Sequence, residues 1–174
     1  MDAVAGWVVA SNLFNFVWIF LWHYQQFPLT LIAMGRLLIS LLATYVKLRV
    51  GLEKRSWQGK LLVDTPFSIY LGWVTVAVVA NVSQVLYVLG WRGAPLTEPL
   101  WTVILLGVAG LLGILMIFLR KEAAYPAVLV WAFVGIWVKQ GGTPLVATTA
   151  LIGAIVLGVL ALGRLVVPGK MKAA

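Results

Sequence analysis

Several polar side chains stand inside apolar segments of this sequence, where they can bind a ligand or a neighbouring helix. The stretch SNLFNFVWIFLWHYQQFP, residues 11–28, sets two amides and two indole rings among apolar residues. At about 100° per residue of an α-helix, one arc of roughly 140° holds Asn12, Asn15, Trp18, Trp22 and His23. Amides supply directional hydrogen bonds and indoles supply flat apolar walls, which is typical of sites for apolar ligands. We expect this arc, with Asn12 and Asn15, to face the interior of a helix bundle.

A second, narrower stripe of the same kind follows later in the chain. On a helical wheel, an arc of roughly 80° holds Tyr70, Trp73, Ala77, Asn81, Gln84 and Tyr87. Two interpretations stay open for both stripes. The amides can hydrogen-bond across a helix interface, at about 0.6–2 kcal/mol each. Alternatively, the rings and amides line a pocket for an apolar ligand. Both interpretations can hold together for different amides.

Arg36 is a basic residue that lies inside an apolar segment, away from either end of that segment. It follows Pro28 by about 12 Å along a helix. The carboxylates all lie at segment ends or in loops, at Asp2, Glu53, Asp64, Glu98 and Glu122. Arg36 therefore either snorkels and binds carbonyls and amides of neighbouring helices, or pairs with an anionic ligand group or a lipid head group.

Catalytic and metal-binding patterns are missing from the sequence. There is no cysteine and only one histidine, His23, which has no acidic neighbour and is typical of a residue at a membrane interface. There is no paired carboxylate inside an apolar segment, no Ser–His–Asp set, no HExxH and no P-loop. We therefore expect a protein that is not an enzyme, with no metal site and no required cofactor.

The composition predicts an integral membrane protein that is all α-helical. The 174 residues are 63% hydrophobic and 10% charged, with a mean hydropathy of +1.03. A spanning helix needs roughly 20 apolar residues. The sequence offers about six such segments, near residues 3–24, 29–48, 66–90, 100–119, 124–138 and 144–166, of which the fifth is short. The longest polar connection, LRVGLEKRSWQGKLLVDTP, is expected to lie along the membrane interface with Trp57 as an anchor.

The basic residues predict the orientation of this bundle. With six spans, one side carries Lys47, Arg49, Lys54, Arg55, Lys60, Arg120, Lys121, Arg164, Lys170 and Lys172, and the other carries Arg92 and Lys139. Positive residues accumulate on the cytoplasmic side, so we expect both termini in the cytoplasm. The net charge is +8, but the basic residues flank apolar segments, so this charge does not indicate a nucleic-acid partner.

Two motifs resemble the translocator protein family, also called tryptophan-rich sensory proteins (TspO/MBR). LFNFVW contains Asn15 three residues before Trp18, and YLGWVTVAVVAN contains Tyr70, Trp73, Ala77 and Asn81 in the spacing of another family helix. PFSIYLGWVTVA and YPAVLVWAFVGI are similar to a longer bacterial branch. The motif resemblance covers roughly residues 9–90. It implies a family whose five helices enclose a pocket for porphyrins and other flat lipophiles.

The resemblance also implies how the chain is divided. Residues 1–90 would hold three TspO-like helices and residues 91–174 about three additional ones, in a single membrane domain. The first two family helices and the Trp-x-Pro-Pro lid loop have no counterpart in this sequence. A bacterial inner (cytoplasmic) membrane is the implied location.

These observations together lead to one leading hypothesis and two alternatives. The leading one is a membrane protein that binds a porphyrin, haem or a similar flat lipophilic ligand, as sensor, carrier or chaperone. The expected ligand-binding residues are Asn15, Trp18, Arg36, Tyr70, Trp73, Ala77 and Asn81. One alternative is a structural or assembly subunit that forms a homo-oligomer or joins a larger membrane complex. The other is a small-molecule transporter with Arg36 in its path.

Overall fold

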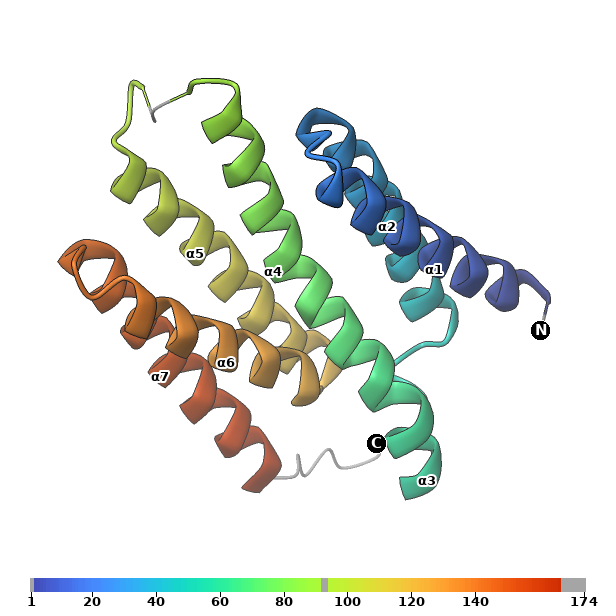
Figure 1. Ribbon diagram of the computed structural model, residues 1–174. Coiled ribbons are helices and arrows are strands. Elements are labelled where there is room, and N and C mark those ends of the chain that lie inside the picture. Colours follow the sequence, from blue (N-terminus) through green and yellow to red (C-terminus); the bar gives the residue numbers. More distant parts are fainter. Residues whose placement is uncertain (1, 92–93, 167–174) are drawn as a thin grey trace.

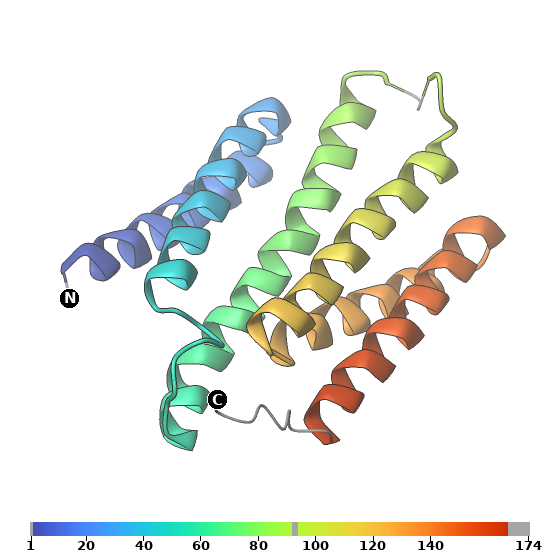
Figure 2. The ribbon, with the colours of Figure 1, turned by 180° about the vertical axis from the view of Figure 1, so that it is seen from behind.

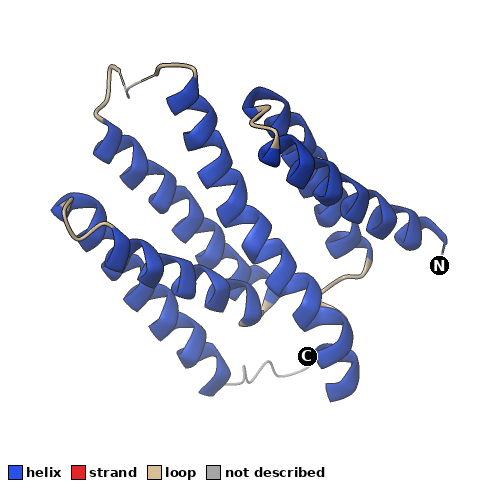
Figure 3. Cartoon of the chain, viewed as in Figure 1, coloured by secondary structure: helices blue, strands red, loops and turns tan. Residues whose placement is uncertain are grey.

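The computed structural model describes residues 2–91 and 94–166, and its regular elements are all helices (Figure 3). Their bounds are α1 Asp2–His23, α2 Phe27–Lys47, α3 Trp57–Gly59, a π-helical turn Lys60–Asp64, α4 Thr65–Val88, α5 Glu98–Leu115, a π-helical turn Met116–Arg120, α6 Ala124–Lys139 and α7 Pro144–Val166. Five helical stretches are long and apolar enough to cross a membrane, and α6 is shorter. The predicted all-α polytopic bundle, including its short fifth segment, is confirmed.

Local signals in the sequence set where several helices begin and end. Prolines occupy the first turns of α2 and α5, where the missing N–H needs no helical acceptor. The Thr97 hydroxyl accepts the backbone N–H of Leu100 and caps α5. Gln25 and Lys121 take positive φ angles of 57° and 56°, which end α1 and the turn after α5. These breaks separate the apolar runs into distinct spans.

Helix α4 stands between two groups of helices (Figure 1). The α1–α2 pair lies on one side of it, with α2 in contact, and α5, α6 and α7 lie on the other side. The view from behind shows the same order (Figure 2). The core is apolar and is centred on residues buried to 3% exposure or less, among them Leu37, Leu41, Leu71, Leu129 and Leu157. Because lipid tails are as apolar as these side chains, close packing between helices, and not transfer out of water, holds the two groups on α4.

The arc on α1 is only partly interior, so the expectation for it was wrong in part. Asn15 and Trp18 are half-buried, but Asn12, Trp22 and His23 are exposed. The cause is that α1 packs against α2 alone. A helix with one neighbour buries a stripe narrower than the polar arc that the wheel defines. On α4, Trp73 and Tyr87 are also exposed, at 41% and 57%.

The polar connection between α2 and α4 is partly helical. From Trp57 the chain forms α3 and the π-helical turn and runs on into α4, so that one helical stretch covers Trp57–Val88. Trp57 is 70% exposed. The interfacial position of this segment and the cytoplasmic termini stay predictions. Of the residues used for the orientation, Arg92, Lys170 and Lys172 lie outside the described residues.

Close packing of α6 on α7 yields a testable prediction. A Cβ added to Gly153 would lie 2.7 Å from two ring carbons of buried Phe133, whereas one added to Gly158 on the same helix meets nothing within 4 Å. We expect overpacking in Gly153→Ala to lower the free energy of unfolding by about 1–3 kcal/mol. The higher helix propensity of alanine should offset up to about 1 kcal/mol of this loss. Gly158→Ala should be neutral or stabilising. Unfolding in a denaturing detergent measures both, and equal stabilities would contradict the packing.

Candidate functional site

The residues that resemble the family pattern gather on one face of α4. Tyr70, Ala77 and Asn81 follow each other at helical spacing and lie at or against the core, with Asn81 only 1% exposed. Trp73 belongs to the same stripe but keeps 41% of its surface exposed. The face is thus buried along part of its width and open along one edge. It combines aromatic rings, a small residue and an amide in an otherwise apolar setting.

Trp18 connects α1 to this face. Its Nε1 donates a hydrogen bond of 3.1 Å to Oδ1 of Asn81. The backbones of α1 and α4 do not approach each other closely within the described residues, so the indole spans the distance between the two helices. The sequence resemblance singled out both residues, and the structure brings them together. The Trp18 ring also lies 5.6 Å from Trp22, which extends the aromatic surface toward the end of α1.

Two polar groups on the α4 face are buried without a hydrogen-bond partner among the described residues. They are the Tyr70 hydroxyl and Nδ2 of Asn81. The two residues are three helical turns apart, about 16 Å along the axis, and point within about 20° of each other around it. An unpaired buried polar group costs about 1–3 kcal/mol. These groups therefore have hydrogen-bonding capacity that the bundle itself does not use.

Trp131 of α6 adds a ring that the sequence analysis did not select. It meets Trp73 edge-to-face, with ring centroids 4.8 Å apart, and is 65% exposed. Its position in the middle of the span VLVWAFVGI was the available signal, because interfacial tryptophans lie at span ends. Trp73 and Trp131 together form an open aromatic edge beside Ala77 and Tyr70.

Arg36 and Asn15 lie apart from this face. The Arg36 guanidinium sits 5.7 Å from the centroid of Phe14 and borders an apolar groove of 290 Å³ between α1 and α2. Asn15 is half-buried on α1. Of five clefts that the described residues form, only this groove includes one of the seven predicted residues, and that residue is Arg36. The assignment of these seven residues to a ligand site stays a prediction.

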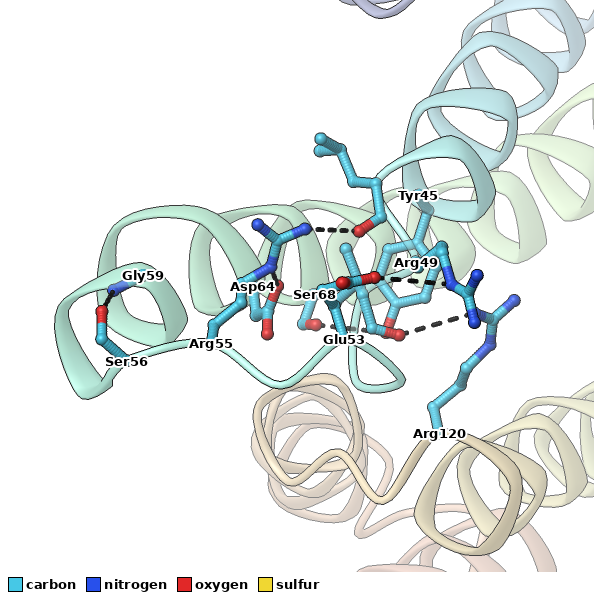
Figure 4. A network of polar contacts seen from close by, with 11 residues as sticks. Tyr45, Arg49, Glu53, Arg55, Ser56, Gly59, Asp64, Ser68 and Arg120 are labelled. Carbon is cyan, nitrogen blue, oxygen red and sulfur yellow. Dashed lines mark hydrogen bonds and ion pairs between the residues drawn. The ribbon is translucent and has the colours of Figure 1, made fainter.

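A polar cluster at the other end of α4 was missed by the sequence analysis (Figure 4). The hydroxyls of Tyr45 and Ser68 are 3.2 Å apart, and the Arg120 guanidinium lies 5.4 Å from the Tyr45 ring. Asp64 is only 5% exposed, and its Oδ1 lies 3.0 Å from Nε of Arg55. The two atoms form an ion pair, but they are not aligned for a hydrogen bond. Arg55 also donates to the Leu48 carbonyl at 2.6 Å. The cluster ties α2, the following loop, the start of α4 and the π-helical turn after α5 together.

Glu122 completes this cluster next to a cleft of 550 Å³ that Lys54, Lys60 and Lys121 also line. Its Oε1 accepts the backbone N–H of Ala124 at 3.0 Å. Burial raises the pKa of Glu122 above its ordinary 4.5, and hydrogen bonds from Ala124 and Ser68 partly offset this rise. No group of three or more His, Cys, Asp or Glu residues that could hold a metal occurs in the described part of the chain.

The arrangement on α4 is suited to binding by stacking and hydrogen bonding. A sequence model described as TSPO-like protein matches residues 1–163, nearly the whole chain. The chain belongs to the TSPO-like family. This family match extends beyond residues 9–90, which carried the motif resemblance, and covers both halves of the bundle. Comparison with curated proteins and with solved structures gave no significant match.

The bond between Trp18 and Asn81 predicts an energetic coupling in this TSPO-like protein. Trp18→Phe removes the donor and leaves buried Asn81 with no partner, so we expect a loss of about 1–3 kcal/mol in unfolding free energy. In a double-mutant cycle with Asn81→Ala, the coupling should be about 0.6–2 kcal/mol. Trp7→Phe, at an exposed site on the same helix, is the control and should change stability by less than about 0.5 kcal/mol. Additive losses would rule out the bond.

The raised pKa of Glu122 predicts a pH-dependent stability. Its folded pKa lies above the unfolded value, so its stabilising contribution is complete below pH 4.5 and is lost as the pH rises through the folded pKa. Glu122→Gln cannot ionise and escapes this loss. We expect the variant to unfold at a higher temperature than the parent at pH 7–8 and at the same temperature near pH 4. Glu53→Gln removes a half-exposed carboxylate as the control. A constant difference across pH would contradict the assignment.

Proposed function

We propose that this TSPO-like membrane protein binds a flat lipophilic ligand, a porphyrin or a similar tetrapyrrole, on the α4 face beside α1 and α6. The observation that carries the proposal is the pair of buried, unpartnered polar groups, the Tyr70 hydroxyl and Asn81 Nδ2, on a face with aromatic rings. A ligand that accepts these two donors would recover hydrogen bonds that the bundle leaves unmade.

The rings around these donors fit the shape of such a ligand. Trp18 lies on one side of the face, and Trp73 with Trp131 lies on the other. Flat aromatic ligands stack on indoles and bury large apolar areas. Ala77, between Trp73 and Asn81 along the helix, keeps the space above the helix free of a bulky side chain. Asn15 and Arg36 would act at the margin, with Arg36 available for a carboxylate.

The open edge of the face bears on how the ligand would arrive. Trp73 and Trp131 are 41% and 65% exposed, so they meet the lipid or a partner. A lipophile dissolved in the bilayer can reach them without crossing the polar ends of the bundle. This access supports a role as carrier, sensor or chaperone. The same exposed pair favours the second candidate, an assembly subunit whose α4 and α6 rings pack on another membrane protein.

A tyrosine pair gives the sharpest test. The Tyr70 hydroxyl has no partner among the described residues, so Tyr70→Phe should leave the stability of the ligand-free protein unchanged or higher. If the hydroxyl binds the ligand, the same variant should weaken protoporphyrin or haem binding about fivefold to tenfold, about 1 kcal/mol. Tyr125→Phe is the matched control, because its hydroxyl donates to Thr75 at 3.1 Å and should matter for stability alone.

The measurement is quenching of tryptophan fluorescence in detergent-solubilised protein, with Trp73→Phe and Asn81→Ala beside the tyrosine variants. Saturable quenching, weakened by Tyr70→Phe and Asn81→Ala and not by Tyr125→Phe, supports the proposal. Linear quenching that is identical in all proteins means partitioning into micelles and ends the ligand proposal. Stable co-purification of one defined partner, lost on Trp131→Ala, would then favour the assembly role.

A further inference from the structure

Arg36 is a cation at the middle of a membrane-spanning helix, and the bundle gives it no anionic partner. It lies nine residues after Phe27 and eleven before Lys47, so about 14 and 16 Å of helix separate it from the two ends of α2. The residue is exposed and forms neither an ion pair nor a hydrogen bond with any residue that the structure describes. A charge at this depth is costly in hydrocarbon, so it marks a candidate site.

The bundle holds this charge at depth and does not direct it to a membrane surface. The Arg36 guanidinium lies 5.7 Å from the centroid of the Phe14 ring on α1. Phe14 is nine residues from His23, the end of α1, and so stands at the same depth as Arg36. A snorkelling arginine would leave this level for the head groups. The only carboxylate in the sequence of α1 and α2 is that of Asp2, about 18 Å along α1 from Phe14.

An apolar groove between α1 and α2 begins at this charge. It measures 290 Å³ and is lined by Arg36 and by six apolar residues, Phe14, Val17, Leu21, Leu29, Ile32 and Ala33. Ala33 is 4% exposed and forms the floor, whereas Leu29 and Ile32 are 48% and 59% exposed and form the rim. The groove lies apart from the α4 face. It opens to the lipid and carries a single positive charge at its deep end.

The dimensions of the groove favour a single hydrocarbon chain. From Leu29 to Arg36 it follows seven residues of α2, a length of about 10 Å. Its volume over this length gives a cross-section of about 28 Å². A helix is about 10 Å across and has a cross-section of about 80 Å², so a neighbouring helix cannot enter the groove. An unbranched aliphatic chain is narrow enough to lie between α1 and α2.

We propose that this groove binds a long-chain carboxylate, that is a fatty acid, with its carboxylate on Arg36 and its chain toward Leu21 and Leu29. The guanidinium presents a planar fork of donors that matches a carboxylate bidentately. The apolar walls contact the methylene groups that follow. The phosphate of a bilayer lipid lies outside the hydrocarbon core, about 15 Å from its midplane, so it does not reach Arg36 at this depth.

The test uses the full chain in phosphatidylcholine nanodiscs, with [1-¹³C]palmitic acid followed by ¹³C NMR of its carboxyl carbon. The chemical shift of this carbon reports whether the acid is ionised. A bilayer raises the pKa of the dissolved acid by desolvation, whereas a guanidinium beside the carboxylate lowers that pKa. We expect a second carboxyl resonance that empty nanodiscs lack and that saturates with added acid. It should stay ionised at a pH where the bilayer-dissolved acid is protonated.

Four variants separate the charge from the groove. Arg36→Gln should weaken this binding about tenfold or more, because the charged pair is lost. Lys47→Gln removes a charge at the end of the same helix and should bind like the parent. Val17→Trp fills the groove and leaves Arg36 intact, so it should weaken binding as well. Val9→Trp adds the same ring at an exposed site of α1 outside the groove and should bind normally.

Competition and lipid composition identify the chemistry of the ligand. Unlabelled palmitate should displace the labelled acid, whereas hexadecan-1-ol, which has the same length and no charge, should not. Nanodiscs of phosphatidylglycerol should leave the second resonance in place, because the phosphates stay at the membrane surface. Asn81→Ala on the α4 face should leave palmitate binding unchanged, so this proposal and the tetrapyrrole proposal can fail separately.

Any of five results would overturn the proposal. There is no saturable second resonance, Arg36→Gln or Val17→Trp binds like the parent, or the alcohol displaces the acid as palmitate does. The fourth is loss of the resonance in phosphatidylglycerol, which would mean that Arg36 meets head groups. The fifth is its loss in Asn81→Ala, which would place the acid on the α4 face. Equal unfolding temperatures of parent and variants show that weaker binding does not come from a loss of fold.

Discussion

A bundle in hydrocarbon must satisfy its polar groups from its own atoms, because the solvent offers no hydrogen bonds. Most hydroxyls here do so locally. Ser11, Thr44, Thr75, Ser83 and Thr149 each donate to a carbonyl one turn earlier in their own helix. Bonds between helices are fewer and join Trp18 to Asn81, Tyr45 to Ser68, and Tyr125 to Thr75. Against this background the unpartnered groups stand out, and the ligand site proposed on α4 is built on two of them, the Tyr70 hydroxyl and Asn81 Nδ2.

The fold could be predicted because its main determinant, the length and order of the apolar runs, can be read directly along the sequence. Apolar runs of membrane length, broken by proline and glycine, define each helix within a few residues, including the short span that became α6. Which side of a helix is buried is a different question. The wheel assigned Asn12 to the interior, but α1 has a single helical neighbour and leaves Asn12 exposed. Periodicity identifies a face, and only the arrangement of helices shows whether another helix covers it.

The candidate site was predictable in its central pair and not in its margins. Trp18 and Asn81 were found through their motifs, and they bond to each other across 63 positions of sequence. Trp131 comes from a later helix, and its place beside Trp73 depends on how α6 crosses α4. The same holds for the pair of Asp64 and Arg55. Their partnership follows from a loop that folds back, which residue spacing does not encode.

The strengths of attachment along α4 differ in a way that bears on binding. Near its start, Ser68 bonds Tyr45 of α2 and Asp64 pairs with Arg55, while Thr75 receives Tyr125 of α6. About 20 Å further along the helix, the side toward α1 is held by one long side chain, Trp18. Regions with fewer cohesive contacts open at lower free energy, and ligand sites are drawn from them. A ligand entering beside Asn81 would therefore displace one hydrogen bond, whereas entry near Ser68 would require the rupture of a network.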